Sequence, residues 1–216
     1  MIPLSKEEIE EIFNYLDNTK LHKTKSLFYK LQYYYARRSE EIVTIKVSDI
    51  DFNLNRITIN IAKKKTNAPI NLKLIPKVKA GLLEIIEEKG LEADDYIFID
   101  DISNKDSYKR TMRKYLERNS CKITKELFGK EIRLNTHDFR RLGGQHLYLA
   151  GYKLEHLQEL YQHIDINQTI AYLQIDEIVI DNLLNYYCWT ITPLTISYFI
   201  IFFLIFSIAE APGNPG

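Results

Sequence analysis

THDFRRLGGQHLYLA, residues 136–150, is the stretch that decides which fold this sequence predicts. The pattern predicts a helix, on which residues three apart lie on one face, so His137 and Arg140 would point the same way. An imidazole beside a guanidinium has little use in an apolar core. It suits an anion with several oxygens, and phosphate is the first candidate. The alternative is a solvated, charge-rich helix face, which the hexapeptide THDFRR (136–141), taken alone, favours.

Basic residues are concentrated in three parts of a chain that is neutral as a whole. The 216 residues include 29 Lys+Arg and 29 Asp+Glu, which argues weakly against a nucleic-acid partner. However, six basic residues and no acid lie from Lys20 to Arg38, and seven basic residues and no acid lie in 52–83. Residues 105–141 hold twelve basic residues and five acids. Such patches usually mean only a solvated surface, but three in one chain favour a polyanionic partner.

Length and cysteine content restrict the class of protein. The length suits one domain, or one domain with an appendage, and gives enough chain for a core. Cys121 and Cys188 lie far apart in the sequence and form no ligand motif. This favours a reducing compartment without structural zinc. No secretory signal is recognised at the start of the chain.

Hydrophobic periodicity predicts a mainly α body with a small antiparallel β-sheet, extending to about residue 187. Two strands, 56–61 and 70–75, are expected to form a hairpin around the turn KKKTNAP. The segment 38–45 continues a helical pattern that 46–55 breaks. Helices are predicted at 5–16, 24–36, 76–90, 107–124, 136–150, 153–161 and 166–174.

Residues elsewhere in the chain indicate a function for the pair His137 and Arg140. His163 comes 23 residues after Arg140, and Tyr172 comes nine residues after His163. Upstream, RSEEIVTIKVSDID (38–51) begins with Arg38, and Lys65 lies in the turn of the predicted hairpin. The ordered set Arg…Lys…His-x-x-Arg…His…Tyr resembles the catalytic domain of the tyrosine recombinases, the family of phage-type integrases and Xer-type resolvases. The resemblance covers about residues 5–175. It implies the tyrosine recombinase catalytic-domain fold.

The resemblance implies that DNA is cut through a phosphotyrosine. Breaking a phosphodiester without water or a metal ion requires a protein nucleophile and groups that hold charge on the phosphoryl oxygens. Tyr172 would attack phosphorus and keep the bond energy in a 3′-phosphotyrosine, so that no ATP, other cofactor or metal ion is needed. Arg38 and Arg140 would hold the non-bridging oxygens, because a planar guanidinium matches two oxygens at once.

Three further side chains receive roles from the same resemblance. Lys65 would protonate the departing 5′ oxygen as general acid. His137 would assist Tyr172 by proton exchange, and His163 would donate a hydrogen bond to a phosphoryl oxygen. Glu41 would hold the arginine segment in place.

Each of these assignments has a plain alternative. Tyr172 is one of fifteen tyrosines, and most tyrosines belong to a core or an interface. His163 could cap a helix, and Lys65 could be one more lysine in a solvated turn. Arg37 could take the place of Arg38, although Arg38 has the correct spacing to the acidic residues that follow. Occurring together, in order and in register, the six residues favour the catalytic interpretation.

The sequence departs from the family pattern at several positions. Gly143 and Gly144 stand where larger residues are usual, and two glycines inside a helix cost about 2 kcal/mol relative to alanine, which puts the local packing in question. Gln162 replaces the glycine that usually precedes the second histidine, so the turn that presents His163 is expected to differ. The first catalytic helix is expected to begin at Ser5, which leaves no room for the family's N-terminal domain.

The function expected from the resemblance is site-specific DNA recombination, that is, integration or excision, by an enzyme that cleaves and rejoins strands. The expected partners are double-stranded DNA and further copies of the chain, as a tetramer on paired sites. The expected location is the cytoplasm, in association with the nucleoid. One alternative is a truncated DNA-binding remnant of an integrase that no longer recombines. The other is an activity like that of a type IB topoisomerase.

The residues after 187 are treated separately from the catalytic domain, which is assigned to 1–187. The segment 188–216 is a hydrophobic tail of unknown role, and no charge occurs from Asn182 to Ala209. This run is long enough to span a bilayer, although Pro193 interrupts any early helix. A membrane anchor through 189–209, a segment that docks on a neighbouring subunit and a non-native extension all remain open. We favour the third.

Overall fold

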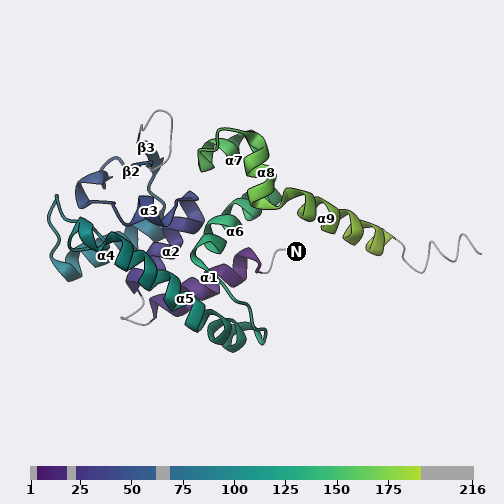
Figure 1. Ribbon diagram of the computed structural model, residues 1–216, viewed down its shortest axis with the longest axis horizontal. Helices are drawn as coiled ribbons and strands as arrows, with labels where there is room; N and C mark the ends of the chain where they lie inside the picture. Colours follow the sequence, from purple (N-terminus) through teal and green to yellow (C-terminus); the bar gives the residue numbers. More distant parts are fainter. Residues whose placement is uncertain (1–3, 19–22, 62–68, 191–216) are drawn as a thin grey trace, which may run out of the picture. The chain divides into compact units, whose positions relative to one another are not determined.

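The computed structural model describes residues 4–18, 23–61 and 69–190 and is mainly helical, as predicted (Figure 1). Contacts within the chain define two units, whose boundary in the sequence lies between Leu173 and Gln174. The described α-helices are α1 (Lys6–Asp17), α2 (Lys23–Tyr35), α3 (Ser39–Ile42), α4 (Pro76–Lys89), α5 (Lys105–Phe128), α6 (Thr136–Leu149), α7 (Leu154–Tyr161), α8 (Ile166–Leu173) and α9 (Ile175–Thr190). Two short 3-10 helices are η2 (Val47–Asp49) and η3 (Ile102–Asn104).

The predicted hairpin is present, with one more strand than expected. Strands β2 (Arg56–Ile59) and β3 (Ile70–Lys73) pair antiparallel, with Ile57 opposite Leu72. Strand β1 (Ile50–Asp51) pairs with β2 from the other side, so the order is β1-β2-β3. Two residues are too few to show an alternating pattern, which is why the sequence did not predict β1. The turn of the hairpin, residues 62–68, lies outside the described residues.

Helix α2 is the central helix of the unit that ends at Leu173. Its side chains are buried without a break from Ser26 to Tyr33, a run of more than two turns, so every side of the helix is covered. Phe139 of α6 stacks on Tyr29 of α2 at 5.0 Å and on Phe13 of α1 at 5.6 Å between ring centroids. Aromatic stacking thus fixes α6, the helix of the opening motif, against the core.

The two glycines of α6 have a packing reason. A Cβ atom on Gly143 would lie 2.1 Å from the backbone oxygen of Tyr33 in α2. A Cβ atom on Gly144 would lie 2.3 Å from the hydroxyl oxygen of Tyr161 and 2.7 Å from Leu173 Cδ2. The two glycines lower the helix propensity of α6, but only glycine permits α6 to approach its neighbours so closely.

The helical pattern predicted for 38–45 ends early. Helix α3 stops at Ile42, because the next residues bond to a distant segment instead. The amide of Ile97 donates to the carbonyl of Ile45 at 3.0 Å, and the amide of Val47 donates to the carbonyl of Asp95 at 3.0 Å. The short apolar run that includes Ile97 thus supplies the partners that a longer helix would have supplied from within.

Helix α9 covers the segment expected to close the catalytic domain and runs three residues past 187, to Thr190. The rest of the hydrophobic tail, 191–216, lies outside the described residues, so its three interpretations stay open. Within the part of the chain that the structure describes, no helix is long and apolar enough to cross a membrane.

Candidate active site

The two adjacent arginines before α3 have different environments. Arg37 is 1% exposed, and its guanidinium donates to the backbone carbonyls of Tyr35 and Leu160. Burial lowers the pKa of Arg37 to about 10. Arg38 is partly exposed and donates to the buried Glu41 at 3.1 Å. Glu41 also lies 3.9 Å from the Arg37 guanidinium, so it holds the segment in place. Of the two arginines, Arg38 is the one free to meet a ligand.

The start of α6 is fixed by reciprocal capping. Asn135 accepts a hydrogen bond from the amide of His137 at 2.8 Å, and the Asp138 carboxylate accepts one from the amide of Asn135 at 2.8 Å. The other carboxylate oxygen of Asp138 accepts from Arg141 at 2.7 Å. Arg141 therefore bonds within α6, whereas Arg140, the residue before it, points into the protein.

The guanidinium of Arg140 lies close to two aromatic rings, those of Tyr161 and Tyr172. Its central carbon is 4.8 Å from the ring centroid of Tyr161 and 5.6 Å from that of Tyr172. The side chain is buried, with 2% exposed, and burial lowers its pKa. One terminal nitrogen, Nη2, donates to the Tyr161 carbonyl at 3.3 Å. The other, Nη1, is buried and finds no hydrogen-bond partner among the described residues. Such a group is costly unless a ligand satisfies it.

His163 follows the end of α7 and faces the Tyr172 ring, with centroids 5.8 Å apart. The residue before it, Gln162, caps α7 in the left-handed conformation with φ 57° and ψ 42°. The backbone turn that glycine would favour is thus kept, at a cost of about 1 kcal/mol for a side chain in this region. His163 Nδ1 lies 3.0 Å from Thr169 Oγ1. Burial, together with nearby arginine charges, lowers the pKa of His163 to about 4, so the ring is neutral near pH 7.

Tyr172 lies on α8 and is half-buried. Its hydroxyl donates to the backbone carbonyl of His137 at 3.4 Å. Burial raises the pKa of Tyr172, while the positive charges of Arg140, Arg141 and Arg38 oppose that rise. The pKa of His137 is lowered by desolvation and by the charges of Arg140 and Arg38. The start of α3, helix α6, the end of α7 and helix α8 therefore bring five of the six predicted residues to one place.

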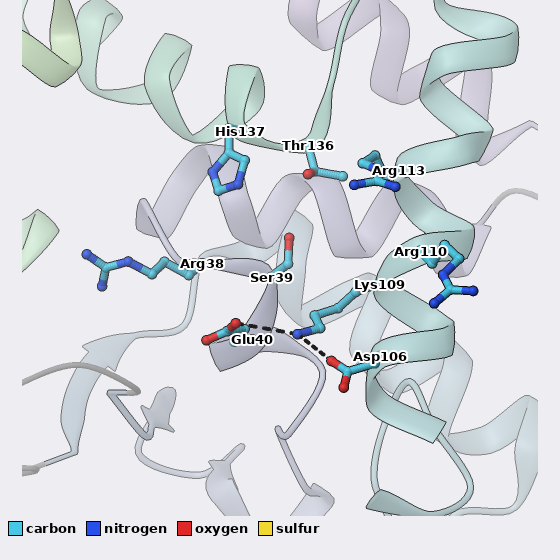
Figure 2. A pocket seen from close by; sticks show the side chains of 9 residues that line it. All are labelled: Arg38, Ser39, Glu40, Asp106, Lys109, Arg110, Arg113, Thr136 and His137. Atoms are coloured by element: carbon cyan, nitrogen blue, oxygen red, sulfur yellow. Dashed lines mark hydrogen bonds and ion pairs between the residues drawn. The ribbon is translucent and has the colours of Figure 1, made fainter. Parts of the chain in front are cut away.

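An open pocket of about 380 Å³ adjoins this cluster (Figure 2). Arg38 and His137 form one side of it. Lys109, Arg110 and Arg113 of α5 form the other side, and Lys109 is engaged by Asp106 at 2.8 Å and Glu40 at 3.5 Å. The lining is rich in cations, as a site for an anion requires. Lys65, the sixth predicted residue, lies outside the described residues, so its place in the site stays a prediction.

Two residues with a part in this arrangement were not singled out from the sequence, and a third, Arg37, was named only as an alternative to Arg38. Tyr161 contacts Arg140, Thr169 bonds His163, and Arg37 binds the last turn of α7. The sequence could have indicated Thr169, because it lies three residues before Tyr172 and so on the same helix face. Burial of Tyr161 and Arg37 has no local signal. Within the described residues no group of three or more His, Cys, Asp or Glu side chains could hold a metal ion.

Comparison with known proteins identifies the relatives of this chain. The model of the phage integrase family matches residues 3–177. A probable integrase/recombinase of Acholeplasma phage L2 is 26% identical over 176 residues, which are 79% of this chain and 57% of that protein. A tyrosine recombinase of Pseudothermotoga lettingae is 26% identical over 168 residues, 76% of this chain and 54% of that protein. The chain thus spans a little over half the length of these relatives.

Among solved structures, the Tn1549 transposon integrase in complex with transposon right end DNA is similar. It superposes with a TM-score of 0.64 at 16% sequence identity and covers 79% of this chain and 60% of that one. At this level of identity the likeness concerns the fold.

Proposed function

We propose that this chain, which belongs to the phage integrase family, cuts and rejoins DNA at specific sites through a 3′-phosphotyrosine intermediate. The chain has the tyrosine recombinase catalytic-domain fold that the sequence resemblance implied. The observation that carries the proposal is the Arg140 guanidinium, which is buried beside Tyr172 and has one nitrogen without a hydrogen-bond partner in the described part of the chain. A phosphoryl oxygen would supply the missing acceptor next to a phenol that can attack phosphorus.

The reaction balances without an external energy source. Tyr172 Oη attacks phosphorus, a P–O bond to tyrosine forms, and the bond from phosphorus to the 5′ oxygen breaks. The phenol gives up its proton, with His137 as the predicted acceptor, and the 5′ oxygen takes a proton from Lys65. In the second half a 5′-hydroxyl attacks the phosphotyrosine and releases Tyr172. That these steps need no metal ion is part of the proposal.

Positive charge and fixed donors would stabilise the transition state. Arg38 from the start of α3 and Arg140 from α6 would hold the non-bridging oxygens, and preorganised donors of this kind contribute several kcal/mol. Neutral His163 can still donate. If the Thr169 hydroxyl donates to Nδ1, the ring proton lies on Nε2, which then points a donor at the phosphoryl group.

The proposed substrate is duplex DNA, held partly by the cationic side of the pocket on α5. Arg110 and Arg113 are exposed there and suited to backbone phosphates, which fix position without reading sequence. Exchange between two duplexes requires four strands to be cut. With one Tyr172 per chain, the assembly is a tetramer of this chain on paired sites. A DNA substrate implies a location in the cytoplasm with the nucleoid.

The test uses an oligonucleotide duplex nicked beside the scissile phosphate, so that cleavage traps the protein on DNA. The target sequence is found first, by enrichment of genomic fragments that the protein binds. The wild type should give a DNA-linked band on a denaturing gel, and Tyr172→Phe should give none. A band that survives in Tyr172→Phe means that another residue attacks. Binding without a band supports a DNA-binding remnant, and relaxation of supercoils without strand exchange supports a topoisomerase.

Neighbouring arginines provide a matched control. Arg140→Ala should abolish the band while leaving most of the DNA affinity, because the guanidinium acts mainly on the transition state. Arg141→Ala removes the same charge one residue away, where it is engaged by Asp138, and should change cleavage little. Equal losses in the two variants would contradict the assignment of Arg140.

A further inference from the structure

Arg140 and Tyr161 are joined by two reciprocal hydrogen bonds. The Tyr161 hydroxyl donates to the backbone carbonyl of Arg140, and the Arg140 guanidinium donates to the backbone carbonyl of Tyr161 at 3.3 Å. Tyr161 is buried, with 1% of its surface exposed. Each side chain thus fixes the backbone of the other, which ties the last turn of α7 to the first half of α6.

The ring of Tyr161 also touches the other predicted groups. Its centroid lies 4.8 Å from the central carbon of the Arg140 guanidinium, 5.4 Å from the His163 ring and 5.4 Å from the Tyr172 ring. A flat aromatic face attracts a guanidinium and restricts its tilt. A single side chain therefore contacts three of the six residues assigned to the reaction.

Gly144 supplies the space that this ring occupies. A Cβ atom there would lie 2.3 Å from the Tyr161 hydroxyl oxygen and 2.8 Å from its Cε2 atom. One turn of α6 thus combines Arg140, which the ring supports, with Gly144, which admits the ring. The two positions are four residues apart and so lie on the same helix face.

We propose that Tyr161 is a positioning residue that sets the plane of the Arg140 guanidinium for the phosphoryl oxygens, with Gly144 reserved for its ring. Tyr161 touches no DNA atom in this role and acts through Arg140. The inference rests on the proposed function. The competing explanation is that Tyr161 is only a well-packed core tyrosine, whose loss would lower stability without a specific effect on cleavage.

The kinetic test compares Tyr161→Phe and Tyr161→Leu on the nicked duplex under single-turnover conditions. Tyr161→Phe keeps the ring and should retain most of the rate. Tyr161→Leu should slow cleavage by about 10- to 100-fold, because a displacement near 1 Å in a reacting group has effects of this size. The affinity for DNA should change less than about threefold, since the guanidinium acts mainly on the transition state.

The same substitution made in an Arg140→Lys protein separates an effect on the position of the guanidinium from an effect on stability. In Arg140→Lys, which has no plane to orient, the further change Tyr161→Leu should slow cleavage by less than about threefold, because residues that act as a unit are not additive. Tyr29→Leu is the matched control. Tyr29 is also buried, and its hydroxyl also donates to a backbone carbonyl, that of Met112 at 2.9 Å. This variant should unfold at a lower temperature. Although the Tyr29 ring stacks on Phe139 of α6, its loss should slow cleavage by the folded protein far less than Tyr161→Leu does.

The outcomes divide cleanly. The inference is overturned if Tyr161→Leu cleaves like wild type, if it slows cleavage equally in both backgrounds, or if Tyr29→Leu slows cleavage as much. A spectroscopic readout keeps it testable without DNA. The Arg140 Nε–H signal in a nitrogen-15 spectrum, assigned by its loss in Arg140→Lys, should shift in Tyr161→Leu and stay in Tyr29→Leu. Wild type without a DNA-linked band refutes the proposed function alone, and an unmoved signal refutes this inference alone.

Discussion

Replacing Gly143 by alanine tests how closely α6 and α2 pack. The new Cβ would lie 2.1 Å from the backbone oxygen of Tyr33 and 3.0 Å from its carbonyl carbon. An ordinary contact is about 3.4 Å, so the helices must separate by roughly 1 Å, and overpacking of a core costs about 3 kcal/mol at the upper end of its usual range. Alanine returns about 1 kcal/mol of helix propensity. The net loss should be about 2 kcal/mol.

Gly81 in α4 gives the matched control for this substitution. Its new Cβ would meet only the end of the Leu27 side chain, at 3.3 Å, and that side chain can move. Gly81→Ala should therefore stabilise the protein by about 0.5 kcal/mol, because moving the Leu27 side chain offsets part of the gain of about 1 kcal/mol in helix propensity. Urea unfolding of both variants measures the difference, expected to be about 2.5 kcal/mol. If Gly143→Ala is as stable as Gly81→Ala, the close approach of α6 to α2 is wrong.

Three further outcomes are expected. Affinity for duplex DNA should fall with salt, with a slope of about −0.9 per phosphate contact, and removing Arg110 and Arg113 together should reduce its magnitude by about 2; an unchanged slope would place the contacts elsewhere. Folded His163 has a pKa of about 4 against about 6.5 when unfolded, so stability should rise with pH between these values and level off above. His163→Gln should remove that share of the rise in urea titrations. A chain shortened after Thr190 should keep single-site cleavage and gain solubility, because an exposed apolar run drives association; loss of cleavage would make the tail part of the catalytic fold.

Local signals account for what the sequence predicted. Ser5 and Glu8 form the reciprocal cap that a serine three residues before a glutamate favours, with bonds of 2.8 and 3.2 Å, and α1 begins there. Gly90 ends α4 in the left-handed conformation, which glycine adopts readily, close to the predicted end of the helix at 90. The six-residue set was predicted from the resemblance to the tyrosine recombinases, whose residue order and spacing it shares. Helix geometry by itself predicted only that His137 and Arg140 share a face.

Contacts between distant segments account for what the sequence did not predict. The early end of α3 depends on backbone groups near Ile97, about fifty residues away in the chain, and no pattern around Ile42 announces them. Arg37 is buried and Arg38 is partly exposed because the guanidinium of Arg37 donates to the carbonyl of Leu160. At both places, contacts in the tertiary structure override local propensity.

The Arg140 guanidinium has two duties, and thermodynamic linkage joins them. One nitrogen donates to the carbonyl of Tyr161, and the other, which has no hydrogen-bond partner among the described residues, would bind a phosphoryl oxygen under the proposed function. Coupling free energy is reciprocal. If Arg140 holds the phosphoryl group as proposed, the factor by which order at the end of α7 strengthens that hold equals the factor by which the held group favours order in α7. Under the proposed function, the hold of Arg140 on the phosphoryl group and local order next to His163 are therefore coupled.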